Sequence, residues 1–136
     1  MKRTAKAIWN GTIKEGSGTI STSSEILNKA PYSYTSRFKD GPGTNPEELL
    51  AAAHSGCFTM KVSADLAEAG FTPTTLETTS EVTLEDGKIS KSALTLSATI
   101  EGITEEKFQE IVKKSKETCP VSQAFDMEIT LSATLN

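Results

Sequence analysis

The sequence predicts an α+β fold in which antiparallel sheets wrap around one long, buried central helix. The helix is expected at residues 46–69, where the side chains are small or apolar on nearly every side, as in buried helices. Alternating polar and apolar residues before and after it have the period of β-strands. The predicted order β-β-β-α-β-β-α-β in 136 residues indicates a single domain, residues 1–136.

The first third of the chain is expected to form three strands. Residues 3–12 alternate weakly, and the glycines of residues 14–18 supply the next turn. Residues 19–23 are β-branched and polar, which is typical of an edge strand. Residues 32–38 alternate aromatic and polar side chains and predict a third strand, which closes with Arg37.

The long helix has clear boundary signals. Asn45 is a good N-cap, Pro46 suits the first helical position, and Glu47 places negative charge in the first turn. Gly70 marks the end. One chain has few other elements with which to cover a helix that is apolar all round. We therefore expect two such helices to pack together in a homodimer. The alternative is a monomer that covers its own helix.

The rest of the chain predicts a hairpin, a second helix and a last strand. An Asp-Gly turn joins the two hairpin strands, and Thr104 caps the helix. The strands are expected at residues 76–84, 89–100 and 127–135, and the helix runs from Thr104 to a break at Cys119-Pro120.

Composition excludes several function classes. A formal net charge of −4 gives no electrostatic reason to bind nucleic acid or an anionic membrane surface. No apolar run approaches the roughly 18 residues that a membrane-spanning helix needs. The basic first residues are not followed by a long apolar segment, so we expect no signal peptide and a cytoplasmic location. Two cysteines in such a chain favour free or catalytic thiols over a structural disulfide.

The two cysteines occupy different electrostatic settings. Cys119 precedes Pro120 at the start of a short helix, whose N-terminus favours a thiolate. Cys57 is in the middle of the long helix, where burial raises the pKa of a thiol, so it needs a cation. Arg37 is the best candidate for this cation. The alternatives are an ordinary exposed strand residue at Arg37 and two inert, buried thiols.

Two further polar residues belong to the long helix. Glu47 lies ten residues before Cys57, about 15 Å along a helix, so it can approach only the Cys57 of an antiparallel partner. Its expected task is to hold Arg37 by a bidentate pair, and the alternative is a helix-dipole residue. His54 shares a face with Cys57, either as a base or as a structural histidine. One histidine and two separated cysteines lack the usual ligand set for zinc.

Two spaced motifs resemble the OsmC/Ohr family of thiol-dependent peroxidases, and the likeness covers the whole chain. They are Asn45-Pro46-Glu47-Glu48-Leu49 continued by Ala51-Ala52-Ala53-His54 and Cys57-Phe58, and Cys119-Pro120-Val121-Ser122-Gln123. Within the family the chain resembles the OsmC branch. Arg37 is placed in the strand before the helix, and His54 occupies the place of an aromatic residue in the Ohr branch.

The resemblance implies an intertwined homodimer with two active sites at the interface. It further implies that Cys57 is the peroxidatic cysteine, that Cys119 is the resolving cysteine, and that Arg37 and Glu47 form the polar pair that activates Cys57. No metal, haem or flavin is implied. The expected reductant is an external dithiol, which the family suggests to be of the lipoyl type.

The expected reaction is attack of the Cys57 thiolate on a hydroperoxide, followed by a sulfenic acid and a disulfide with Cys119. An apolar wall from Phe58, Met60 and the alanines is expected to favour organic hydroperoxides over hydrogen peroxide. The alternative function is a redox-sensing or small-ligand-binding protein of the same fold without turnover.

Overall fold

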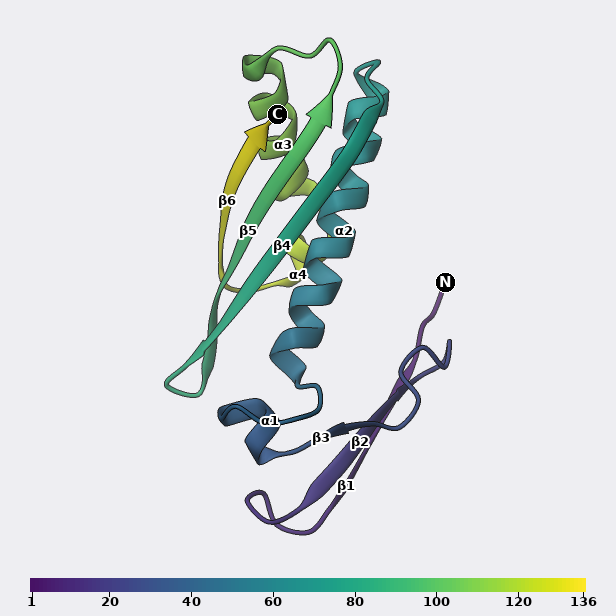
Figure 1. Cartoon of the computed structure of the whole chain (residues 1–136), viewed down its shortest axis with the longest axis vertical. Coiled ribbons are helices and arrows are strands. Elements are labelled where there is room, and N and C mark those ends of the chain that lie inside the picture. Colours follow the sequence, from purple (N-terminus) through teal and green to yellow (C-terminus); the bar gives the residue numbers. More distant parts are fainter. The chain divides into compact units, whose positions relative to one another are not determined.

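The computed structural model describes residues 1–136, and the chain divides into two compact units, Met1–Leu49 and Leu50–Asn136. Each unit contains one three-stranded sheet (Figure 1). The elements in chain order are β1 (Ala5–Asn10), β2 (Ser17–Thr22), β3 (Ala30–Tyr32), α1 (Tyr34–Phe38), α2 (Pro46–Glu68), β4 (Pro73–Glu85), β5 (Lys88–Ile100), α3 (Glu105–Thr118), α4 (Pro120–Ala124) and β6 (Glu128–Leu135). None of the helices is long and apolar enough to cross a membrane.

The sheet of the first unit is antiparallel, in the order β1-β2-β3. The prediction that residues 19–23 form an edge strand is wrong, because β3 pairs with β2 on the side away from β1. Gly18 in β2 lies opposite both Trp9 and Tyr32. A Cβ at Gly18 would approach Tyr32 Cε1 to 2.5 Å and Trp9 Cε3 to 2.6 Å, so only glycine lets the two rings meet over the strand.

The predicted third strand at residues 32–38 is also wrong. The strand ends at Tyr32, and residues 34–38 form the helix α1. Ser33 is its N-cap, and Ser33 and Ser36 form a capping box, with each side chain accepting from the other's backbone N–H. Tyr34 and Phe38 are one turn apart, with ring centroids separated by 4.9 Å. Arg37 therefore lies in the last turn of a helix.

The boundaries predicted for α2 are confirmed to within a residue. The Asn45 side chain accepts a hydrogen bond of 2.8 Å from the Glu48 backbone N–H, as an N-cap does. The Thr44 hydroxyl donates to the Glu48 carboxylate at 2.7 Å. The helix ends at Glu68, and Gly70 then adopts a φ of +88°, a left-handed conformation that ends many helices.

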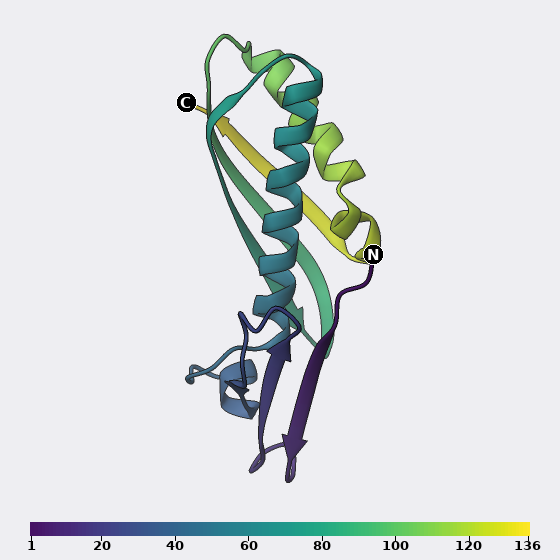
Figure 2. The same ribbon diagram turned by 90° about the vertical axis from the view of Figure 1, so that its right-hand side faces the viewer.

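The sheet of the second unit has the order β4-β5-β6 and is mixed. The hairpin of β4 and β5 is antiparallel, as predicted, but β6 pairs parallel with β5, so the expectation of antiparallel sheets throughout is wrong. The reason is the connection: α3 and α4 carry the chain back across the sheet before β6 begins. Within this unit, α2 and α3 lie on the same face of the sheet (Figures 1 and 2).

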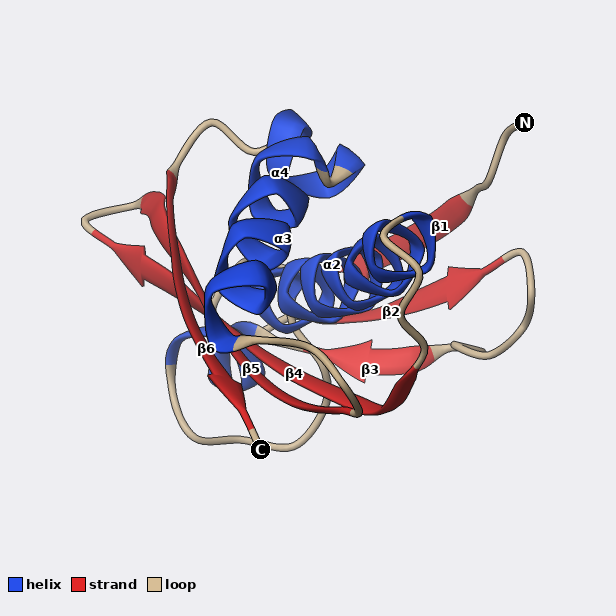
Figure 3. Ribbon diagram, turned by 90° about the horizontal axis from the view of Figure 1, so that it is seen from above, coloured by secondary structure: helices blue, strands red, loops and turns tan.

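The hydrophobic core belongs to the second unit. Alternate residues of β5 are buried, and α2 and α3 lie on one face of the sheet to which β5 belongs (Figure 3). The buried apolar residues are Phe58, Val62, Leu66, Leu94, Leu96, Ala98, Ile100, Phe108, Ile111, Val112 and Cys119. None of them comes from Met1–Leu49, whose sheet therefore has no apolar core of its own.

A buried carboxylate joins α2 to α3 inside this core. Asp65 accepts hydrogen bonds from Lys61 Nζ at 2.6 Å and from the Ser115 hydroxyl at 2.7 Å. Burial alone would raise the pKa of Asp65, but these two donors outweigh it and hold the pKa below its ordinary value of 3.8. The ionised form is thus built into the packing of the two helices.

Replacing Asp65 by alanine should lower the free energy of unfolding by about 2 kcal/mol, because it removes the acceptor of the partly buried Lys61 ammonium and the hydrogen bond that ties Ser115 of α3 to α2. Urea unfolding at neutral pH measures the change. The matched control is Glu110→Ala, which breaks an exposed ion pair of 3.3 Å with Lys107 and should change stability by less than about 0.5 kcal/mol. Equal effects of the two substitutions would contradict this account of Asp65.

Candidate functional site

Each unit holds one cluster of groups capable of chemistry. In the second unit the cluster is a pair of thiols. Cys57 lies in the middle of α2, and Cys119 is the N-cap residue of α4. Their Sγ atoms are 3.2 Å apart, and both thiols are free. A disulfide bond is about 2.05 Å long, so a small local movement would join them. Cys119 is fully buried, whereas Cys57 is partly exposed.

The surroundings of the two thiols push their pKa values in opposite directions. Burial raises the pKa of Cys57, and the contact with Cys119 raises it further, against a hydrogen bond from the backbone of Val121. Burial also acts to raise the pKa of Cys119, but hydrogen bonds with Ser122, Cys57 and Val121 outweigh it, so that pKa is lowered. In this unit, taken by itself, Cys119 is therefore the more acidic of the two thiols.

His54 is buried next to the pair but forms no hydrogen bond with Cys57. Its Nδ1 lies 2.6 Å from the Ser92 hydroxyl, and its Nε2 lies 2.8 Å from the Ser122 hydroxyl. The Phe125 ring packs edge-on against the imidazole, with centroids 5.0 Å apart. Burial lowers the pKa of His54 below its ordinary value of 6.5, so the ring is neutral at physiological pH.

The first unit holds an arginine–carboxylate pair. Arg37 Nη2 donates to Glu47 Oε1 at 2.9 Å, and Arg37 Nε lies 3.2 and 3.3 Å from the two carboxylate oxygens. Ser36 fixes the helix that carries Arg37, because its hydroxyl donates to the Thr44 carbonyl at 2.8 Å. The Asn45 amide donates in turn to the Ser36 carbonyl at 3.0 Å. Two arms of the guanidinium are thus held against a buried carboxylate.

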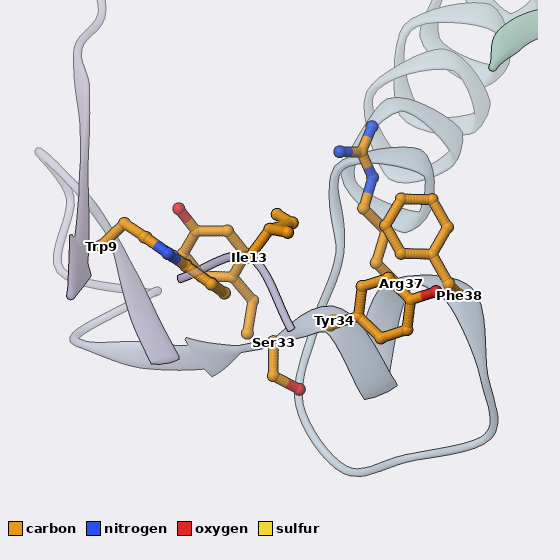
Figure 4. A pocket seen from close by; sticks show the side chains of 7 residues that line it. Trp9, Ile13, Ser33, Tyr34, Arg37 and Phe38 are labelled. Carbon is orange, nitrogen blue, oxygen red and sulfur yellow. The ribbon is translucent and has the colours of Figure 1, made fainter. Parts of the chain in front are cut away.

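A pocket of about 240 Å³ opens beside this pair (Figure 4). Its walls are mostly aromatic or aliphatic, with the guanidinium of Arg37 as the charged group. The lining residues are Trp9, Ile13, Tyr32, Ser33, Tyr34, Arg37 and Phe38. Arg37 lies over the Phe38 ring, 5.1 Å from its centroid. The pocket therefore combines an apolar wall with one fixed positive charge.

The structure places the four residues expected to act together in two separate pairs. Cys57 contacts Cys119 in one unit, and Arg37 forms an ion pair with Glu47 in the other. The expectation that Phe58 lines an apolar wall for the substrate is wrong, because its side chain is fully buried in the core. Met60, in contrast, is 76% exposed. No three of the His, Cys, Asp and Glu side chains gather as ligands of a metal ion would.

Sequence reasoning missed two features of these sites. The aromatic pocket was hidden because residues 32–38 resembled a strand, although Tyr34 and Phe38 are spaced as neighbours on a helix. The hydroxyl partners of His54 were missed because Ser92 and Ser122 are far away in the sequence. The signal for the serine in β5 was available: Ser92 occupies a core-facing position of an alternating strand that otherwise carries Leu, Ala and Ile.

Comparisons with known proteins agree on one family. A profile of the OsmC-like protein family matches residues 39–134. The peroxiredoxin OsmC of Escherichia coli (strain K12) is 48% identical over 130 residues, which cover 93% of this chain and 91% of that protein. An organic hydroperoxide resistance protein-like sequence of Staphylococcus aureus (strain USA300) is 32% identical over 101 residues, 71% of this chain and 72% of that one.

Solved structures share the fold. The organic hydroperoxide resistance protein OhrB of Bacillus subtilis aligns with a TM-score of 0.68 at 26% identity, covering 98% of each chain. An organic hydroperoxide resistance protein of Elizabethkingia anophelis aligns with a TM-score of 0.73 at 24% identity, covering 100% of this chain and 99% of that one.

The neutral, buried His54 predicts a pH dependence of stability. Because its pKa is lowered on folding, the unfolded chain binds a proton that the folded chain does not. The free energy of unfolding should therefore fall as the pH drops below about 6.5, with a slope approaching 1.4 kcal/mol per pH unit. Urea unfolding at one protein concentration measures it between about pH 7.5 and 5.

His54→Gln is the control for this prediction, because the chain has no other histidine. The glutamine variant should show a flat profile over that pH range. A wild-type profile that is equally flat would show that His54 becomes protonated in the folded protein without cost.

Proposed function

We propose that this chain, which belongs to the OsmC-like protein family, reduces organic hydroperoxides with Cys57 and Cys119 as its redox pair. Family membership and 48% identity to a peroxiredoxin make it a thiol-dependent peroxidase of oxidative stress defence. The observation that carries the assignment of residues is the 3.2 Å contact between the two free sulfur atoms. Two thiols at that distance can form a disulfide without any refolding of α2 or α4.

The reaction would begin at Cys57, which is the partly exposed member of the pair. Its thiolate attacks the terminal oxygen of the hydroperoxide, the O–O bond breaks, and the alkoxide leaves and is protonated to an alcohol. The resulting sulfenic acid condenses with Cys119 to a disulfide and releases water. An external dithiol then restores both thiols by exchange, and the lipoyl type is our proposal for it. We propose no metal, haem or flavin in this cycle.

Cys57 needs a cation to react at neutral pH, and residues 50–136 supply none among the groups that act on its pKa. We assign that role to Arg37, held in place by Glu47. Glu47 precedes Cys57 by ten positions in the helix, about 15 Å, which puts the pair out of reach of the Cys57 in the same chain. The pair would therefore act on Cys57 of the partner subunit in a homodimer.

The exposure of apolar residues supports such a dimer. One face of α2 is buried by its own unit, but the opposite face exposes small residues and Met60. The sheet of residues 1–49 likewise leaves Ile8 45% exposed and has no buried apolar side chain. Exposed apolar surface on two elements needs a partner, and a second copy of the chain provides a self-complementary one. We propose that these surfaces form an intertwined dimer with two sites at its interface.

The aromatic pocket beside Arg37 accounts for the preference we propose for organic substrates. Its rings would pack against the alkyl or aryl group of a hydroperoxide, while the guanidinium faces the oxygen atoms. Hydrogen peroxide offers nothing to the rings and would be reduced less well. We place this reaction in the cytoplasm and propose no nucleic-acid or membrane partner.

The roles proposed for the two cysteines predict different losses of peroxidase activity when each is replaced by serine. Cys57→Ser should abolish the steady consumption of cumene hydroperoxide with a dithiol. Cys119→Ser should reduce about one equivalent and then stop with Cys57 over-oxidised to sulfinic acid, detected by mass spectrometry. Wild-type turnover by Cys57→Ser would refute the assignment. Absence of turnover in the wild-type chain would instead favour a redox sensor of the same fold.

Which subunit supplies the Arg37 that acts on a given Cys57 can be tested by mixing two inactive variants. These are Arg37→Ala and Cys57→Ser, mixed under conditions that exchange subunits. If Arg37 acts on the partner subunit, each mixed dimer regains one intact site, and the mixture should recover about a quarter of wild-type activity. If Arg37 acts within its own chain, the mixture stays inactive.

Mixing Cys57→Ser with Cys119→Ser is the matched control, because both cysteines of a site come from one chain. This mixture should stay inactive. Recovered activity would place the two cysteines of one site on different chains.

A further inference from the structure

Two contacts join α2 to the start of α4, and only one of them has a place in the chemistry described so far. The first is the 3.2 Å approach of the Cys57 and Cys119 sulfurs. In the second, Nε2 of His54 lies 2.8 Å from the Ser122 hydroxyl. His54 precedes Cys57 by three positions in α2, and Ser122 follows Cys119 by three positions at the start of α4. The two contacts are therefore neighbours, about one helical turn apart.

The second contact matters because α4 has little else to hold it in place. A helix of five residues, Pro120–Ala124, is too short to be stable by itself. Cys119 is the C-cap of α3 and the N-cap of α4, and its ψ of 126° breaks the helical path between them. Val121 packs against the core, and the bond to His54 is the only hydrogen bond that a side chain of α4 makes. The direction that α4 takes after Cys119 therefore depends on these two contacts.

His54 is itself held so that its second nitrogen points at α4. Nδ1 lies 2.6 Å from the Ser92 hydroxyl of β5, which lies 3.0 Å from the Ser80 hydroxyl of β4. The imidazole has no exposed surface. The Phe125 ring, at the C-cap of α4, packs edge-on against it with centroids 5.0 Å apart. A ring that is bonded at one nitrogen and packed along its edge keeps the other nitrogen directed at Ser122.

We propose that His54 is a positioning residue for Cys119. Through Ser122 it fixes the start of α4 on α2, so that the sulfur of Cys119 stays within reach of Cys57 while the two sulfurs are not bonded. The place of this role in a catalytic cycle rests on the proposed function, whereas the effect on disulfide closure does not. His54 acts through Ser122 and forms no hydrogen bond with either sulfur.

The step that depends on this positioning is the resolution of the sulfenic acid. The sulfur of Cys119 attacks the sulfur of the Cys57 sulfenic acid, the S–S bond forms, and the S–O bond breaks. Cys119 is oxidised, the sulfenic sulfur is reduced, and the departing hydroxide combines with the thiol proton of Cys119 to give water. Holding Cys119 in place accelerates this step. A second hydroperoxide then has less time to convert the sulfenic acid to the sulfinic acid.

The first experiment measures how readily the disulfide closes, and it uses no peroxide. The full-length protein is equilibrated with mixtures of reduced and oxidised glutathione, and the fraction of disulfide gives the effective concentration of Cys119 at Cys57. Ser122→Ala removes the hydroxyl that His54 bonds. It should lower this effective concentration about fivefold, which corresponds to the net worth of one hydrogen bond. Ser122→Thr keeps a hydroxyl and should restore most of the wild-type value.

A double-mutant cycle and a control separate this role from a general loss of stability. His54→Phe should lower the effective concentration as Ser122→Ala does, and the two together should lower it no further, because both remove the same bond. Asp65→Ala breaks a buried hydrogen bond between α2 and α3 but none of α4, so its effective concentration should stay close to that of the wild type. An unchanged value in Ser122→Ala, or an equal decrease in Asp65→Ala, would overturn the proposal.

Over-oxidation reports the same positioning during turnover. With cumene hydroperoxide and a dithiol, the fraction of Cys57 converted to sulfinic acid per turnover should be about five times higher in Ser122→Ala than in the wild type. Mass spectrometry measures this fraction. Equal fractions in the two proteins would contradict the role in resolution. A wild-type chain without turnover would refute the proposed function, and the glutathione equilibrium would still decide whether His54 positions Cys119.

The wild-type protein offers a test that does not depend on the folding of any variant. The chain has one histidine, so the nitrogen-15 chemical shifts of its imidazole belong to His54. Because His54 has to hold α4 before and after the disulfide forms, both ring nitrogens should be hydrogen-bonded in the reduced and in the oxidised protein. Loss of the hydrogen bond at Nε2 in either form would overturn the proposal.

Discussion

Helix α2 carries small or apolar side chains on nearly every side, and its own chain covers only one face. The covered face packs Phe58, Val62 and Leu66 onto the sheet β4-β5-β6 and under α3. The uncovered face carries alanines, Gly56 and Met60. Covering this face as well would remove further apolar surface from water. The proposed second copy of the chain would do so on the same helix that carries Cys57.

The covered face of α2 also carries polar groups, and each is fully paired. Asp65 is ionised between Lys61 and Ser115, and His54 is neutral between two serine hydroxyls. The contrast follows from the partners: a carboxylate with two donors keeps its charge, while an imidazole with only neutral neighbours loses its own. Such pairing is what allows a peroxidase to keep titratable groups inside a core without losing its stability.

Local signals in the sequence were sufficient for most of the elements and insufficient for their pairing. The cap of α2 at Asn45 and the hairpin at Asp86-Gly87 depend on contacts within a few residues, and both are present as predicted. The strand predicted at residues 32–38 was wrong because aromatic and polar residues alternate there at the period of a strand. The capping box of Ser33 and Ser36 favours a helix more strongly than that pattern favours a strand. Two predictions about strand pairing were also wrong: the edge position of β2 and the antiparallel direction of β6. Both depend on pairing with strands that lie elsewhere in the sequence.

The sequence by itself determined the family: its motifs point to the one that the comparisons show, and through it to Cys57, Cys119, Arg37 and Glu47 as the expected site residues. Only the tertiary structure decided how they are paired. It brings together two sulfurs that are 62 residues apart in the chain, and it links His54 to serines that are 38 and 68 residues away. The physical reason is that caps, turns and helix faces depend on neighbours in sequence, whereas the ionisation of a thiol depends on whatever the folded chain places against it.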